Sequence, residues 1–351
     1  MPLAPAHPLV DGRTSSAPVV LAARGEKQAT PPIWFMRQAG RSLPEYHQVR
    51  GTTGMLQACL TPELAAEITL QPVWRHDVDA AVFYSDIVIP PLVAGLDVEI
   101  VSGRGPVFAK PVRTATDVAA LPALDSLDFT PIREAIAIIT AELGSTPLIG
   151  FGGAPYTLAS YLIEGGPSKD QARARALMKA DPATFRALLS WCADATAQFM
   201  RAQVEAGASV VQLFDSWAGS LSRTDWATHV APHSAAIFSA LDDLEVPRIH
   251  FGLGMRDMLD LIPDLGAHTV GIDWRTPLDE AAAVLGDRAG VQGNIDPAVL
   301  GAGWDAIRNN VNDVVARGRT ARSHIVNLGH GVTPDTNPAL LTRIVEHVHA
   351  L

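Results

Sequence analysis

The chain has 351 residues, enough for two or three small domains or for one barrel, and a formal net charge of −10. This charge argues against a nucleic-acid-binding protein, because such proteins present a basic face to the phosphate backbone. No apolar stretch is long enough to cross a bilayer, and residues 1–30 lack the features of a signal peptide, so we expect a cytoplasmic protein.

Short runs of β-branched and aromatic residues alternate with helical patterns along the whole chain. This alternation is typical of parallel strands joined by crossover helices. Eight strands are predicted, at residues 33–36, 80–84, 148–151, 210–214, 248–251, 269–272, 290–292 and 324–327. Eight such units predict an α/β fold, a single-domain (β/α)8 (TIM) barrel with its active-site cleft at the carboxyl ends of the strands. We expect residues 1–30 to be a partly flexible N-terminal extension and residues 31–351 to form the barrel.

Helix starts support this interpretation. A capping residue precedes a proline, which fits the first helical position, at Thr61-Pro62, Asp181-Pro182, Thr276-Pro277, Asp296-Pro297 and Asn337-Pro338. Gly266 and Gly286 stand where helix C-caps are expected. The long connections at 87–131 and 164–182 are interpreted as excursions from the barrel.

The first predicted strand ends abruptly at a turn that carries Arg37 and Arg41 beside small residues. A guanidinium matches a carboxylate with two parallel hydrogen bonds, so this turn is a candidate anion-binding site. The alternative is a surface ion-pair network, which would contribute little to stability.

Polar residues also follow the other predicted strands, and in such barrels the chemistry lies at these ends. They are Ser85, Asp86, Tyr156, Tyr161, Asp215, Ser216, Asp273, Arg275, Asn294, Asp296 and His330. Each has a structural alternative: the aspartates can cap turns or orient arginines, the serines can bond to the local backbone, and the tyrosines can pack. His330 is harder to explain by packing because glycines flank it on both sides.

Metal and nucleotide signals are weak. Cys59 and Cys192 are far apart, and each lies in a predicted helix, so neither a disulfide framework nor a cysteine-rich metal cluster is expected. His229 and His233 lack the glutamate of a zinc-protease helix, and Gly252-Leu253-Gly254 lacks the third glycine of a dinucleotide site. No metal site is predicted.

Several motifs together resemble the uroporphyrinogen decarboxylase family. They lie at residues 34–46 (WFMRQAGRSLPEY), 150–161 (GFGGAPYTLASY), 212–219 (QLFDSWAG), 271–274 (GIDW), 292–297 (QGNIDP) and 327–331 (NLGHG). The resemblance spans about residues 31–338. Ser42 replaces an expected aromatic residue and Tyr156 stands where tryptophan is frequent, which leaves every charged group in place.

The resemblance implies a cofactor-independent barrel enzyme, commonly a homodimer, that converts the four acetate side chains of uroporphyrinogen III to methyl groups. It implies that Asp86 and Arg37 are catalytic, with Asp86 facing the pyrrole N–H groups. Arg37 would donate a proton only with an acidic partner or a relayed water, since a guanidinium is a poor acid. The implied substrate-binding residues are Arg37, Gln38, Ala39, Gly40, Arg41, Asp86, Tyr161, Ser216 and His330.

Two other functions are weighed against this one. A corrinoid-linked or thiol methyltransferase of the same barrel superfamily would need a zinc-bound thiolate at a strand end, where neither cysteine is predicted. A non-catalytic tetrapyrrole-binding protein would need the two arginines but not Asp86.

Overall fold

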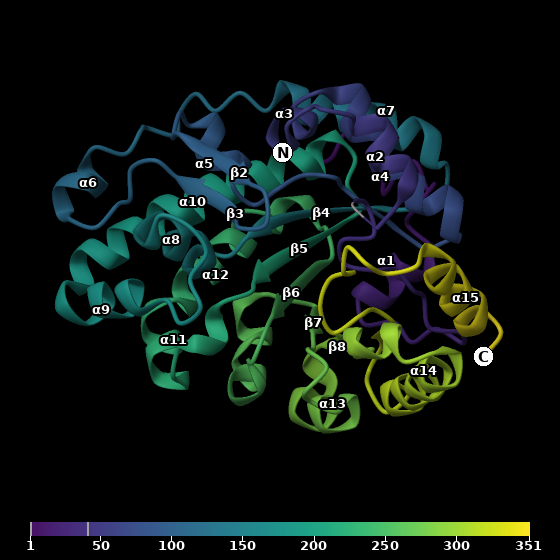
Figure 1. The fold of residues 1–351 in the computed structure, drawn as a ribbon. Helices are drawn as coiled ribbons and strands as arrows, with labels where there is room; N and C mark the ends of the chain where they lie inside the picture. Colours follow the sequence, from purple (N-terminus) through teal and green to yellow (C-terminus); the bar gives the residue numbers. More distant parts are fainter. Residues whose placement is uncertain (1, 41) are drawn as a thin grey trace.

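The computed structural model describes residues 2–40 and 42–351, and shows a curled parallel sheet with helices packed around it (Figure 1). The sheet has seven strands in the order of the chain, and every neighbouring pair is parallel. They are β1 (Ala81–Val82), β4 (Leu148–Gly153), β5 (Val210–Asp215), β6 (Arg248–Gly252), β7 (Thr269–Gly271), β8 (Gly290–Gln292) and β9 (His324–Ile325). The predicted α/β barrel is confirmed.

The predicted first strand, residues 33–36, is reduced to a single bridge between Ile33 and Val326. The bridge is flanked by a hydrogen bond from the Val326 N–H to the Pro32 carbonyl (2.8 Å), and the Asp79 N–H bonds to the Ile33 carbonyl (2.9 Å). The segment therefore fills the eighth place, between β9 and the start of β1.

Side-chain amides replace the strand ladder beyond this bridge. Asn327 Oδ1 accepts a hydrogen bond from the Met36 N–H (2.9 Å), and Gln38 Oε1 accepts one from the Phe35 N–H (2.9 Å). These bonds satisfy the buried backbone without a neighbouring strand. They explain why the prediction of a full first strand was wrong.

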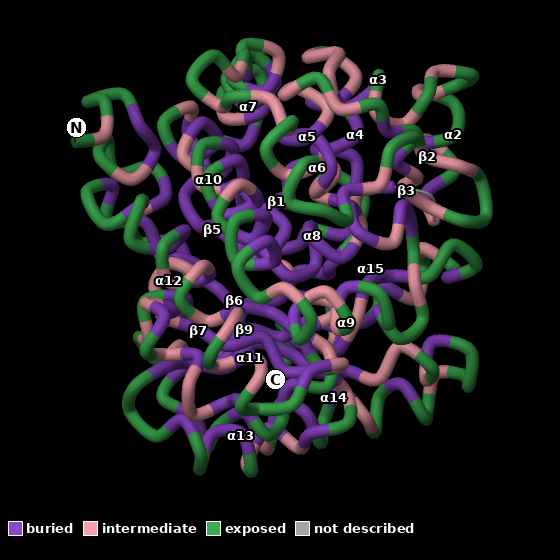
Figure 2. Tube along the Cα trace, turned by 90° about the vertical axis from the view of Figure 1, so that its left-hand side faces the viewer, coloured by how far each residue is buried: buried purple, intermediate pink, exposed green. Residues whose placement is uncertain are grey.

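Helices cover the outside of the sheet, and the strands form the buried centre of the molecule (Figures 1 and 2). The α-helices are α1 (Pro18–Ala23), α2 (Pro44–Arg50), α3 (Met55–Cys59), α4 (Pro62–His76), α5 (Ile89–Val93), α6 (Ala115–Ala119), α7 (Thr130–Leu143), α8 (Pro155–Glu164), α9 (Ala172–Ala180), α10 (Pro182–Ala206), α11 (Arg223–His229), α12 (Ala231–Ser239), α13 (Leu278–Leu285), α14 (Trp304–Gly318) and α15 (Pro338–His349). The 3-10 helices are η1 (Ala218–Ser220), η2 (Asp242–Leu244), η3 (Arg256–Leu261), η4 (Pro263–Leu265), η5 (Gly286–Arg288) and η6 (Pro297–Gly301). No helix in the described residues is long and apolar enough to span a membrane.

The predicted caps have mixed outcomes. The side chains of Asp181, Asp296 and Asn337 accept hydrogen bonds from backbone N–H groups at the starts of α10, η6 and α15, as predicted. Thr61 precedes α4, but its hydroxyl bonds back to Gln57 instead. Thr276 is not a cap, because α13 begins one residue later, at Leu278. The helix ends at Gly266 and Gly286 are confirmed.

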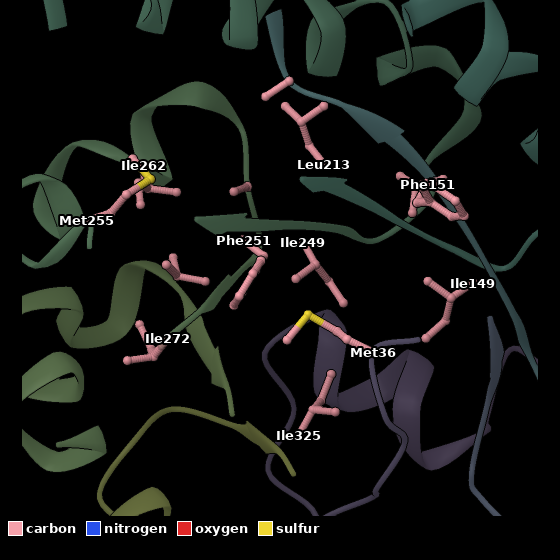
Figure 3. Close-up of a cluster of buried hydrophobic side chains, with 14 of the residues drawn as sticks. Met36, Ile149, Phe151, Leu213, Ile249, Phe251, Met255, Ile262, Ile272 and Ile325 are labelled. Carbon is pink, nitrogen blue, oxygen red and sulfur yellow. The ribbon is translucent and has the colours of Figure 1, made fainter. Parts of the chain in front are cut away.

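The barrel interior combines apolar packing with a short polar chain. Met36, Ile149, Ile249, Phe251 and Ile325 lie together in it (Figure 3). Trp34 Nε1 donates to Gln292 Oε1 (3.1 Å), and Gln292 Nε2 donates to Gln212 Oε1 (2.8 Å). Since β8 and β5 are not neighbours in the sheet, these hydrogen-bonded side chains cross the barrel interior and connect two separate strands.

The two predicted excursions contain further structure. Residues 87–131 hold α5, α6 and an antiparallel hairpin of β2 (Val98–Val101) and β3 (Gly105–Phe108), which sequence patterns did not reveal. The hairpin packs on the end of α8, because the Phe108 N–H bonds to the Gly165 carbonyl (3.2 Å). Residues 164–182 hold α9.

Helix α1 closes the amino-terminal ends of the strands. Val19 and Val20 are fully buried, and the hydroxyl groups of Thr269 and Ser323 donate to the carbonyls of Ala23 and Ala22. Part of the predicted extension is therefore packed into the core. The proposed boundary at residue 30 stays a prediction.

Candidate active site

Arg37 directly follows residues 33–36, the segment that fills the eighth place of the barrel. It adopts a left-handed backbone conformation with φ of 63°. The Val332 N–H bonds to the Met36 carbonyl (2.8 Å), which joins this turn to the loop after β9. A Cβ atom on Gly331 would come within 2.5 Å of Arg37 Cδ, so the stem of Arg37 rests on that glycine. The side chain is exposed and makes no ion pair with the described residues.

The rest of the turn has different environments. Gln38 is fully buried, and its Nε2 donates to the Ala80 carbonyl (2.9 Å) while its Oε1 accepts from Phe35, so its side chain braces the turn. Ala39 is half-buried, and Gly40 has a φ of 149°, which glycine tolerates best. Arg41 lies outside the described residues. A substrate-binding role for these four residues stays a prediction.

Asp86 lies between β1 and α5. Its Oδ1 accepts a hydrogen bond from the Val88 N–H (3.0 Å), so Asp86 caps this turn, and its catalytic role stays a prediction. The backbone of Ile87 also stabilises the charged carboxylate. Burial raises the pKa of Asp86, and the positive charge of Arg37 opposes that rise, which places the two groups in one electrostatic environment.

Tyr161, on α8, belongs to the same environment. Burial and the charge of Asp86 raise the pKa of Tyr161 to about 12, and Arg37 acts against them. Tyr161 therefore keeps its proton at neutral pH and can donate a hydrogen bond. Its ring stacks on Trp217, with centroids 4.1 Å apart and planes tilted by 31°.

Ser216 is half-buried between two anchored residues, Asp215 and Trp217. Asp215 ends β5, is fully buried, and accepts hydrogen bonds from Thr157 Oγ1 (3.0 Å) and Trp226 Nε1 (3.2 Å). Asp215 therefore neither caps a helix nor orients an arginine among the described residues, but holds two other side chains.

His330 is held in one tautomer. Its Nδ1 accepts a hydrogen bond from the Gly331 N–H (2.6 Å), and burial together with the charge of Arg37 lowers its pKa. The ring is consequently neutral at pH 7, with its proton on Nε2. His330 can act as a hydrogen-bond donor beside Arg37.

Two other strand-end residues, Asp273 and Tyr156, make structural contacts. Asp273 accepts hydrogen bonds from the Gly254 N–H (2.7 Å) and Arg275 Nη1 (3.0 Å), and Tyr156 shares a hydrogen bond with Ser220 (3.0 Å). Thr157 and Trp217 are contacts that the sequence analysis missed. The only signal in the sequence was their position beside predicted site residues.

Two further features bear on ligand chemistry. An open pocket of about 670 Å³ lies over α2 and α4, lined by residues that include Glu45, Gln71 and Trp74, and no predicted site residue contributes to it. It is a shallow outer feature, so the strand-end residues are the better candidates for chemistry. Within residues 2–40 and 42–351, no three His, Cys, Asp or Glu side chains are grouped to hold a metal ion.

The comparisons of sequence with known proteins agree on one family. The family model described as uroporphyrinogen decarboxylase (URO-D) matches residues 14–351. Proteins named uroporphyrinogen decarboxylase are 56% identical in Arthrobacter sp., covering 97% of this chain and 99% of the relative, and 54% identical in Saccharopolyspora erythraea, covering 99% and 98%.

A solved methyltransferase from Methanosarcina mazei has the same fold, with a TM-score of 0.82 at 21% identity, covering 96% of this chain and 98% of that one. That likeness extends to the fold alone, whereas the sequence matches cover nearly the whole chain. The chain belongs to the uroporphyrinogen decarboxylase family.

Proposed function

We propose that this protein removes CO2 from the four acetate side chains of uroporphyrinogen III, giving coproporphyrinogen III in tetrapyrrole biosynthesis. Membership of the family supports the activity. The observation that carries the mechanism is the shared electrostatic environment of Asp86, Arg37 and Tyr161. Asp86 is a hydrogen-bond acceptor that suits the central N–H groups of the substrate. Arg37, a cation, and Tyr161, a neutral donor, suit its peripheral carboxylates.

The chemistry requires an electron sink. Protonation of the pyrrole carbon beside an acetate makes the ring cationic, so it can accept the electron pair released when the bond to the carboxylate breaks. CO2 leaves, the exocyclic carbon is then protonated to a methyl group, and the ring proton is returned. Each cycle replaces CO2 by one proton, and the substrate itself supplies the sink.

Asp86 would stabilise the cationic ring. One of its oxygens is held by the Val88 N–H, which fixes the carboxylate so that it can face the pyrrole N–H groups. A fixed negative charge in a partly buried position can lower such a barrier by several kcal/mol. Arg37 supports this role because its charge opposes the rise in the Asp86 pKa.

The peripheral carboxylates would be held by Arg37 and Arg41, with hydrogen bonds from His330 Nε2, the Tyr161 hydroxyl and the Ser216 hydroxyl. Arg37 has no carboxylate partner among the described residues, which leaves its guanidinium available. Because a guanidinium is a poor acid, Arg37 would assist protonation by orienting a water.

The methyltransferase alternative needs an accessible thiolate. Cys59 and Cys192 are fully buried in α3 and α10, and burial raises the pKa of both thiols. Neither thiol is therefore accessible to hold a zinc ion as that alternative requires. The cytoplasmic location and the homodimer stay predictions.

An anaerobic assay with chemically reduced uroporphyrinogen III tests the proposal. We expect coproporphyrinogen III and four CO2 per substrate, with no added cofactor and in the presence of a chelator. Methyl transfer to a thiol, or tight tetrapyrrole binding without CO2 release, would identify one of the two alternatives instead.

A further inference from the structure

The Thr157 hydroxyl links a buried carboxylate to the aromatic pair near the proposed site. Thr157 is buried in the first turn of α8 and donates to Asp215 Oδ1 (3.0 Å). This commits its single proton, so its oxygen is free to accept, and it does accept from the Trp217 N–H (3.3 Å).

Asp215 is itself fixed. It is fully buried, and its second oxygen accepts from Trp226 Nε1 (3.2 Å). His250 Nε2 lies 3.9 Å from the same oxygen, but burial lowers the pKa of His250 to about 4, so this ring is neutral at pH 7. The carboxylate is therefore an acceptor with two donors in place, and it determines which way the Thr157 hydroxyl points.

Trp217 is held by α8 at two points. Thr157 binds its backbone N–H, and Tyr161, one helical turn further along, stacks on its ring. Ser216 lies between Asp215 and Trp217, so its backbone is fixed from both sides. Thr157 and Tyr161 of α8 thus both contact Trp217, the residue that follows Ser216.

We infer that Thr157, oriented by Asp215, is a positioning residue for substrate binding that acts through Trp217 on Tyr161 and Ser216. This inference rests on the proposed function, because Tyr161 and Ser216 are proposed there to hold substrate carboxylates. It adds a residue that need not contact the substrate at all. Thr157 acts on binding and leaves the charge near the reacting carbon unchanged.

Thr157→Val removes the hydroxyl and keeps the shape of the side chain, whereas Thr157→Ser keeps the hydroxyl. We expect Thr157→Val to raise KM for uroporphyrinogen III roughly tenfold with kcat within about threefold, and Thr157→Ser to stay near wild type. Thr269→Val is the matched control, since it removes a buried hydroxyl that bonds to the Ala23 carbonyl at the other end of the barrel. The control should lose similar stability with an unchanged KM.

A structural readout independent of turnover uses 5-fluorotryptophan labelling and fluorine NMR, with the Trp217 signal assigned by its loss in Trp217→Phe. The signal should broaden or shift in Thr157→Val and not in Thr269→Val. In a Trp217→Leu background the ring that stacks on Tyr161 is absent while the backbone N–H that Thr157 binds is kept. Thr157→Val should therefore raise KM less in that background than in the wild type.

The outcomes separate the two proposals. An inactive wild-type protein refutes the proposed function, whereas an active wild type with the KM of Thr157→Val unchanged refutes this inference. If Thr157→Val does not fold, Trp217→Leu takes its place, and an unchanged KM in that variant also overturns the inference.

Discussion

Gly331 supports the stem of Arg37: a Cβ atom at position 331 would meet Arg37 Cδ at 2.5 Å and Cγ at 2.8 Å. The contacted atoms lie in the middle of the side chain, so Arg37 could not avoid them by moving its tip alone. Gly331→Ala should therefore displace the guanidinium and lower kcat/KM about tenfold or more. Gly301→Ala is the control, because nothing lies within 4 Å of its added Cβ. Equal kcat/KM for the two variants would show that Arg37 needs no such support.

Arg37→Gln should harm binding and turnover together, raising KM and lowering kcat, because both proposed roles of the guanidinium are lost. The charge of Arg37 opposes the rise in the Asp86 pKa, so removing it should raise that pKa further. If ionised Asp86 is required, the acid limb of the kcat/KM profile should move to higher pH. Arg308→Gln, at an exposed surface pair, serves as the control. An unmoved acid limb together with a normal KM would place Arg37 outside the site.

The barrel could be predicted because seven of its strands are short apolar runs that alternate with helical patterns along the chain. The eighth place could not be resolved, because Asn327 and Gln38 satisfy the backbone of residues 35 and 36 through their side chains. Local hydrophobic patterns do not report such bonds between side-chain amides and the backbone. The same limitation hid the β2–β3 hairpin, whose half-buried strands lack a clear alternation.

The prediction of Asp86 and His330 as site residues rests on residue type and strand position, and their roles stay predictions. Gln38 shows what position alone misses: it follows Arg37 directly, yet its amide is turned into the protein. Thr157 was missed because neither its residue type nor its position marks it. Its proposed positioning role depends on contacts with Asp215 and Trp217, about 60 residues away in sequence.

His324 should make the fold sensitive to acid. It is buried, and burial lowers its pKa to about 4 from the usual 6.5, so between these values the unfolded chain binds more protons than the folded protein. Stability contributed by this group is present above pH 6.5 and falls as the pH drops toward 4. Asp215, with its pKa raised to about 6, acts in the opposite direction over a similar range.

Because these two groups oppose each other, the test compares His324→Gln with wild type. Urea unfolding at pH 7 and pH 5 should show a smaller loss in the variant, by about 2 kcal/mol. Glutamine can keep the hydrogen bond to the Gly293 carbonyl that His324 Nε2 makes (2.8 Å). Identical losses in the two proteins would mean that His324 is not kept neutral by the fold.

The role of Asp86 is tested most directly by kcat of Asp86→Asn in the anaerobic uroporphyrinogen III assay. Asparagine Oδ1 can still accept from the Val88 N–H, so the turn should persist while the negative charge is lost. Asp128→Asn is the matched control, because exposed Asp128 makes the same local bond to the Thr130 N–H (2.9 Å). We predict that kcat falls by about two orders of magnitude or more in Asp86→Asn, with substrate affinity roughly intact and the control unchanged. Near-normal kcat in Asp86→Asn would contradict the proposal that this carboxylate stabilises the cationic intermediate.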